Sequence, residues 1–161
     1  MNAAFRQQII ELLNTHRIMT IATNRPDGWP QATVVGYTND GLVLYAIVGR
    51  NSQKFRNILR DPRVSLAIGK DYPQPLEIKG LSMAAQVAVV DDDREIARAI
   101  ELLFQRYPEY KTYMTEMRPN VQELAFVRCV PEIISILDYS KGFGHTDLVS
   151  VSADDLSPVH A

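Results

Sequence analysis

The sequence has a single cysteine, Cys129, and three widely separated histidines, His16, His145 and His160. One cysteine excludes an intramolecular disulfide and a cysteine-rich zinc site. The histidines have no carboxylate or cysteine partners at the usual spacing of metal ligands, so we expect no metal site. Cys129 lies in an apolar strand pattern, which predicts a core position rather than a catalytic thiol.

The common motifs of nucleotide binding and of hydrolysis are also missing. There is no Walker motif, no GxGxxG and no GxSxG, which argues against a nucleoside triphosphate site, a Rossmann dinucleotide site and a serine nucleophile. The carboxylates of Asp91-Asp92-Asp93 and Asp154-Asp155 are typical of helix caps and solvated surface. Because no hydrolytic side chains are visible, a bound cofactor is the expected source of any chemistry.

Long apolar runs and a strong charge of either sign are absent as well. No segment reaches the roughly 20 apolar residues of a membrane span, and MNAAFRQQIIELL lacks the apolar run of a signal peptide. The net charge is −2, so nothing global indicates nucleic-acid binding. A length of 161 residues with 46% hydrophobic residues predicts one domain, residues 1–161, with a flexible tail at 152–161. A cytoplasmic location is expected.

Short β-branched runs joined by turn signals dominate the chain. This pattern of hairpins, without regular strand–helix alternation, predicts a mainly β (α+β) fold with flanking helices, in which an antiparallel sheet closes into a barrel. Gly80 is expected to mark a bend or bulge, and residues from Tyr139 onward have no clear pattern. Predicted strands cover 18–23, 31–37, 42–48, 64–68, 76–90, 122–130 and 132–138; predicted helices cover 2–15, 52–60, 91–107 and 109–117.

The strongest chemical signal is the turn before the second predicted helix. Ser52 is expected to cap this helix, and Phe55, Ile58 and Leu59 to pin it to the core. Arg50, Ser52 and Lys54 place a hydroxyl and two cations at a helix N-terminus, where free N–H groups favour anions. The pattern fits a dianionic phosphate. A capped surface helix with solvated cations is the alternative.

A second segment, KGFGH near the end of the chain, combines two glycines, an aromatic ring and two basic side chains. One interpretation is an ordinary loop. The other is a flap on the substrate side of a ligand site, in which Phe143 stacks and His145 serves as a hydrogen-bond donor or acid.

The order of these features resembles the pyridoxamine 5'-phosphate oxidase-like family of FMN-binding split barrels. The shared frame is a DG-x-P turn, a DG hairpin into a strand that carries Tyr45, S-x-K at a helix start and D-P-R-V before the next strand. The similarity extends over about residues 13–90. The ending ILDYSKGFGH is similar to the small members of the family rather than to the full-length oxidase.

This resemblance implies a homodimer of split barrels with FMN at the subunit interface. The implied activity is that of a flavin-dependent oxidoreductase of unknown substrate. NAD(P)H is a candidate electron donor for it. The second strand, QATVVGY, lacks the cations of the full oxidase, which argues against oxidation of pyridoxamine phosphate. The implied phosphate contacts are Arg50, Ser52, Gln53 and Lys54, and the implied ring contacts are Thr33, Val34, Val35, Tyr45 and Ala46.

Two alternatives to this reading stay open. One is a split barrel that uses a deazaflavin or haem in place of FMN. The other is a non-enzymatic module that stores or senses a flavin.

Overall fold

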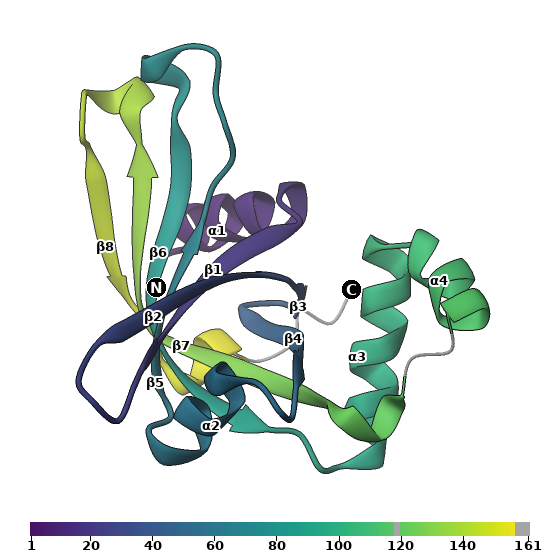
Figure 1. The fold of residues 1–161 in the computed structure, drawn as a ribbon. Helices are drawn as coiled ribbons and strands as arrows, with labels where there is room; N and C mark the ends of the chain where they lie inside the picture. Colours follow the sequence, from purple (N-terminus) through teal and green to yellow (C-terminus); the bar gives the residue numbers. More distant parts are fainter. Residues whose placement is uncertain (118–119, 157–161) are drawn as a thin grey trace.

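The computed structural model describes residues 1–117 and 120–156. In this part of the chain eight antiparallel strands form one curled sheet in the order β2-β1-β5-β6-β7-β4-β3, with β8 beside β7 (Figure 1). The predicted antiparallel split barrel with flanking helices is therefore confirmed. The strands are β1 (Ile18–Asn24), β2 (Pro30–Gly36), β3 (Thr38–Asp40), β4 (Val43–Gly49), β5 (Arg63–Ile68), β6 (Lys79–Val89), β7 (Leu124–Asp138) and β8 (Thr146–Ser150).

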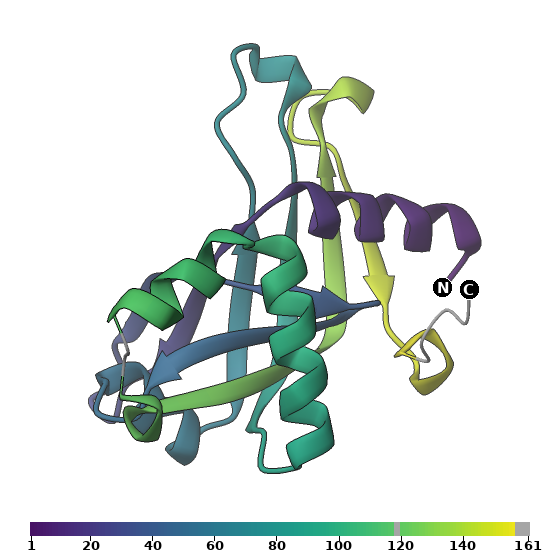
Figure 2. The same ribbon diagram turned by 90° about the vertical axis from the view of Figure 1, so that its right-hand side faces the viewer.

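Within residues 1–117 and 120–156, four α-helices and four short 3₁₀ helices surround the sheet. α1 (Ala3–Thr15) buries Ile9, Leu12 and Leu13 in the core, as its apolar spacing predicts. α3 (Asp93–Arg106) covers the outer face of β4 and β7, and α4 (Glu109–Met117) follows it along the same side (Figure 2). The other helices are α2 (Gln53–Arg60), η1 (Pro75–Glu77), η2 (Val121–Glu123), η3 (Tyr139–Lys141) and η4 (Ala153–Leu156).

One bend in the chain closes the barrel. The segment 30–36 pairs with β1 as β2, and after Tyr37 the same run of chain pairs with β4 as β3. The two ends of the strand order are therefore one stretch of polypeptide. Alternate side chains of β1 and β5 point into the core, as expected for strands with one buried face.

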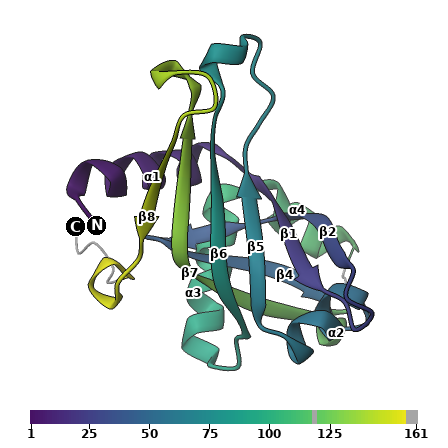
Figure 3. The same ribbon diagram turned by 90° about the vertical axis from the view of Figure 1, so that its left-hand side faces the viewer.

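The opposite face of the sheet carries no helix in the described residues. It runs from β8 through β7, β6, β5 and β1 to β2 (Figure 3). Cys129 lies on the buried side, where burial raises the pKa of its thiol to about 12. The prediction that Cys129 is a core residue is confirmed.

β7 is a single strand, although two strands separated at Pro131 were predicted. Proline lacks the N–H that a ladder needs, yet Pro131 lies where β7 changes neighbours. The half before it pairs with β4 and the half after it pairs with β8. The register with β6 shifts opposite this point, between Ala84 and Ala85. The irregularity predicted at Gly80 is therefore at Ala84 and Ala85.

The end of the chain holds structure that the sequence did not indicate. β8 returns antiparallel to β7, and η4 follows it. The Asp155 carboxylate accepts hydrogen bonds from the N–H and the Oγ of Ser152 at 2.8 and 2.7 Å. These residues belong to the segment 152–161 that was expected to be flexible. Residues 157–161, including His160, lie outside the described residues.

Gly80 is needed for a close approach between strands. A Cβ at this position would lie 2.7 Å from the carbonyl oxygen of Ile68, whereas a Cβ at Gly69 would meet nothing within 4 Å. We expect Gly80→Ala to lower the free energy of unfolding by about 1–3 kcal/mol, the usual cost of overpacking. Gly69→Ala is the matched control in urea unfolding. Equal unfolding midpoints for the two variants would contradict this account.

Candidate functional site

The candidate site is the split where β2 and β4 separate. Continuing the register of β3 and β4 would set Val34 opposite Gly49. In the described sheet, however, β2 pairs with β1 and this part of β4 pairs with β7. Residues 30–36 and 46–49 therefore form no ladder with each other, and we call this line of facing, unpaired strand edges the split. Strand edges without a partner present backbone N–H and C=O groups.

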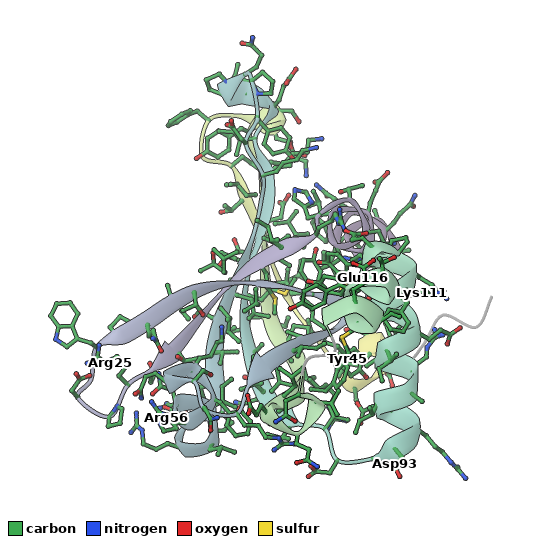
Figure 4. The ribbon with its side chains drawn as sticks, turned by 45° about the vertical axis from the view of Figure 1, so that its right-hand side comes forward. Arg25, Tyr45, Arg56, Asp93, Lys111 and Glu116 are labelled. Carbon is green, nitrogen blue, oxygen red and sulfur yellow. The ribbon has the colours of Figure 1, made fainter. Side chains whose placement is uncertain are left out.

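Most side chains predicted for the flavin ring do not point into this split. Val34 lies on the uncovered face of the sheet and is 64% exposed. Val35 packs against the core, and Ala46 is part of it. Tyr45 lies between the sheet and α3 (Figure 4). The two segments predicted to contact the ring therefore do line the split, but they present their backbone groups to it rather than their side chains.

Tyr45 instead ties α3 to the barrel. Its hydroxyl donates to Glu95 Oε1 at 2.9 Å, and Arg128 Nη1 lies 2.9 Å from both oxygens of the same carboxylate. Burial raises the pKa of Tyr45, so the hydroxyl stays protonated and serves as a donor.

Tyr107, at the end of α3, fixes the closed end of the split. Its hydroxyl lies 3.1 Å from both the N–H and the carbonyl oxygen of Tyr37 and donates to the carbonyl of Arg17. A Cβ on Gly36 would lie 3.2 Å from this hydroxyl, so a residue without a side chain suits the contact. The bend at which β2 becomes β3 is thereby held in place.

The start of α2 lies at the open end of the split. Ser52 Oγ accepts from the N–H of Phe55 at 3.1 Å and donates to the carbonyl of Gly49 at 2.7 Å. The predicted N-cap is confirmed. Because the single hydroxyl proton is used within the turn, a ligand here would meet the backbone N–H groups of the first helical turn.

Lys54 and Thr33, predicted for the phosphate end and the ring end of a cofactor, are in direct contact. Lys54 Nζ donates to Thr33 Oγ1 at 2.9 Å, so α2 bridges to β2 across the split. Burial lowers the pKa of Lys54. An ammonium has three donors, of which Thr33 accepts one. A partly desolvated cation with further donors favours an anionic ligand.

Arg50 and Gln53 are engaged within the chain. Arg50 Nε donates to the carbonyl of Leu124 at 2.9 Å, which joins the turn before α2 to the start of β7. Gln53 Nε2 donates to Asn57 Oδ1 at 2.8 Å, and its Oε1 accepts from Arg56 Nη2 at 3.0 Å. Their contacts position the turn and the helix.

The loop between η3 and β8, which carries Phe143 and His145, lies at the opposite end of the molecule from α2 (Figures 1 and 3). Phe143 is 82% exposed, and within one chain neither residue borders the split. Asp147, which sequence analysis missed, lies 3.1 Å from His145 Nε2 and 2.8 Å from Lys141 Nζ. Residues 145 and 147 have the i, i+2 spacing that puts two side chains on one face of a strand. The sequence could have shown this pair only if β8 had been predicted as a strand.

Two other kinds of site are absent from the described ranges. No three His, Cys, Asp or Glu side chains gather there in a way that could hold a metal ion. No helix in residues 1–117 and 120–156 has the length and apolar character needed to cross a bilayer.

The lowered pKa of Lys54 has a consequence for stability. The folded state binds the Lys54 proton less tightly than the unfolded state, so the buried charge destabilises the fold below this pKa. The penalty is full at neutral pH and fades as the pH rises through the lowered pKa towards 10.5. We expect ligand-free Lys54→Met to melt no lower than the wild type at pH 7, and its advantage to shrink above pH 10. Calorimetry at the two pH values tests this; a lower Tm for the variant at pH 7 would contradict it.

Comparison with known proteins gives relatives of the same fold. A conserved hypothetical protein from Mycobacterium tuberculosis is 28% identical over 95% of this chain and 93% of its own, with a TM-score of 0.71. A heme binding protein from Mycobacterium smegmatis is 22% identical over 93% of this chain and 58% of its own, with a TM-score of 0.73. The heme storage protein HutZ from Vibrio cholerae is 20% identical over 78% of this chain and 89% of its own, with a TM-score of 0.65.

Among curated proteins no sequence matches this chain. The sequence model of the family described as pyridoxamine 5'-phosphate oxidase matches residues 5–133, which is most of the barrel and both α3 and α4. The chain belongs to the pyridoxamine 5'-phosphate oxidase-like family of split barrels.

Proposed function

We propose that this protein binds FMN in the split between β2 and β4 and acts as a flavin-dependent oxidoreductase. The observation that carries the proposal is Lys54, a partly buried cation at the start of α2 that reaches Thr33 on β2. A dianionic phosphate would find the ammonium and the free N–H groups of the first turn of α2 together.

The rest of the split fits a flat polar ring. The border residues 30–36 and 46–49 offer backbone donors and acceptors, which are the groups that orient the edge of an isoalloxazine. Beneath them lies the apolar core, in which Ala46 and Val48 are buried. FMN, when bound, supplies the electron transfer. The chain's own residues anchor the phosphate, orient the ring and keep water from one face of it.

We propose that the active form is a homodimer that uses the uncovered face of the sheet. β2 belongs to both this face and the split, so a second copy packed on the face would also border the site. Small side chains allow two sheets to approach closely, and apolar ones gain by burial. The outward side chains include Ile18, Ala32, Val34, Ser65, Ala67, Ser82, Ala84, Ile133 and Leu148.

Haem is the second candidate cofactor, because two of the relatives above are named for heme binding or storage. The two described histidines do not favour it here. His16 is buried with Nδ1 2.7 Å from the carbonyl of Leu12, and the loop that carries His145 lies at the opposite end of the molecule from α2. We therefore place haem after FMN.

Lys54→Ala tests the phosphate contact. Loss of a charge-assisted contact costs about 1–3 kcal/mol, so we expect FMN affinity to fall about 5- to 150-fold in a flavin fluorescence titration. Arg56→Ala, an exposed cation on the same helix, is the matched control and is expected to bind nearly as the wild type does. Wild-type affinity in Lys54→Ala would remove this lysine from the site.

Ala67→Arg tests the dimer. The substitution places a charge in the middle of the uncovered face, whereas Ala97→Arg places one on an exposed position of α3. We expect light scattering to give twice the 18.2 kDa chain mass for the wild type and Ala97→Arg, and a monomer with weakened FMN binding for Ala67→Arg. A monomeric wild type with full FMN affinity would contradict the interface.

A further inference from the structure

Helix α2 reverses the usual placement of polar and apolar side chains at two positions, although Phe55 and Ile58 are buried as expected. A surface helix normally buries its apolar side chains and exposes its polar ones. In α2 the amide side chain of Asn57 is fully buried, while Leu59, predicted for the core, is 64% exposed. A buried amide does not add to the apolar core, so the reversal indicates a role other than packing.

The contacts of Asn57 join three elements. Its Nδ2 donates to Thr23 Oγ1 on β1 at 3.0 Å and to Gln31 Oε1 on β2 at 3.2 Å. Its Oδ1 accepts from Gln53 Nε2 at 2.8 Å, one turn back on α2. Both amide protons and the carbonyl oxygen are therefore used, and the buried group is fully satisfied.

Asn57 and Lys54 form two parallel links between α2 and β2. They are three residues apart on the helix, hence on one face and about 4.5 Å apart along its axis. Their partners Gln31 and Thr33 are two residues apart on the strand, hence also on one face and about 6.7 Å apart. Core packing of Phe55 and Ile58 holds α2 on the sheet, and the two links to β2 add directional contacts that set its orientation relative to that strand.

We propose that Asn57 is a positioning residue that holds α2 on β1 and β2 so that the Lys54 ammonium is aimed into the split. The short, buried Asn57 side chain sets the geometry, and the long Lys54 side chain carries the charge to the ligand. This inference rests on the proposed role of Lys54 as a phosphate contact. It assigns phosphate selectivity to a residue that does not itself touch the ligand.

The test removes the two fully buried members of the polar link, Asn57 and Thr23, and leaves only the half-buried side chains of Gln31 and Gln53, which water can reach. Thr23→Val together with Asn57→Leu replaces both partners by apolar groups of similar size, a change that is often nearly neutral for folding. Leu59→Ala, on the exposed side of the same helix, is the matched control. Circular dichroism and the Tm of the ligand-free proteins verify that each variant is folded.

The first readout needs no cofactor. Lysine side chains carrying ¹³C-methyl groups are titrated by NMR in the ligand-free protein, and the Lys54 signal is assigned with Lys54→Arg. We expect Lys54 to titrate below the other lysines in the wild type and in Leu59→Ala, and to move up to their range in the double variant, because its side chain swings into solvent. An unchanged Lys54 titration in the folded double variant would overturn the proposal.

The second readout is the ratio of riboflavin to FMN dissociation constants, which isolates the phosphate. We expect this ratio to fall at least fivefold in the double variant, with riboflavin affinity unchanged, and not to fall further when Lys54→Ala is added. Equal losses for FMN and riboflavin would mean a merely structural role and would overturn the proposal. A wild type that binds neither flavin would refute the proposed function, while the NMR titration would still decide the role of Asn57.

Discussion

The bend at Tyr37 is the constraint on which the site depends. Because of this bend, one run of chain pairs first with β1, as β2, and then with β4, as β3, which closes the barrel. The Tyr107 hydroxyl holds the bend from α3, and Gly36 leaves room for it. Because β2 and β4 separate just before this point, closing the barrel also opens the split. The same geometry that completes the fold therefore creates two strand edges without partners.

Helix α2 occupies the open end of this split at a cost to stability. A core built for stability alone gains little from the buried, fully hydrogen-bonded Asn57 and loses by partly desolvating Lys54. Both residues lie on the one helix face that meets β2, and both make hydrogen bonds to it. The unfavourable placement is concentrated where the backbone edges are open, which is the pattern expected of a ligand site rather than of random surface.

Local signals in the sequence predicted much of this arrangement. The Ser52 cap, the turn chemistry and the strand alternation are set by residues close together in the chain, and the structure has them. The continuity of β7 through Pro131, the strand β8 and the burial of Asn57 in place of Leu59 depend on neighbours distant in sequence. The family resemblance implied that Tyr45 lies beside the ring. Its side chain faces α3 because alternate residues of a strand point to opposite faces.

The absorbance spectrum of the protein as purified tests the central claim most directly. The account predicts the two visible bands of a bound oxidised flavin, with the released cofactor identified as FMN by its mass. A Soret band or a deazaflavin band in place of these, together with failure of the ligand-free protein to take up added FMN, would contradict it.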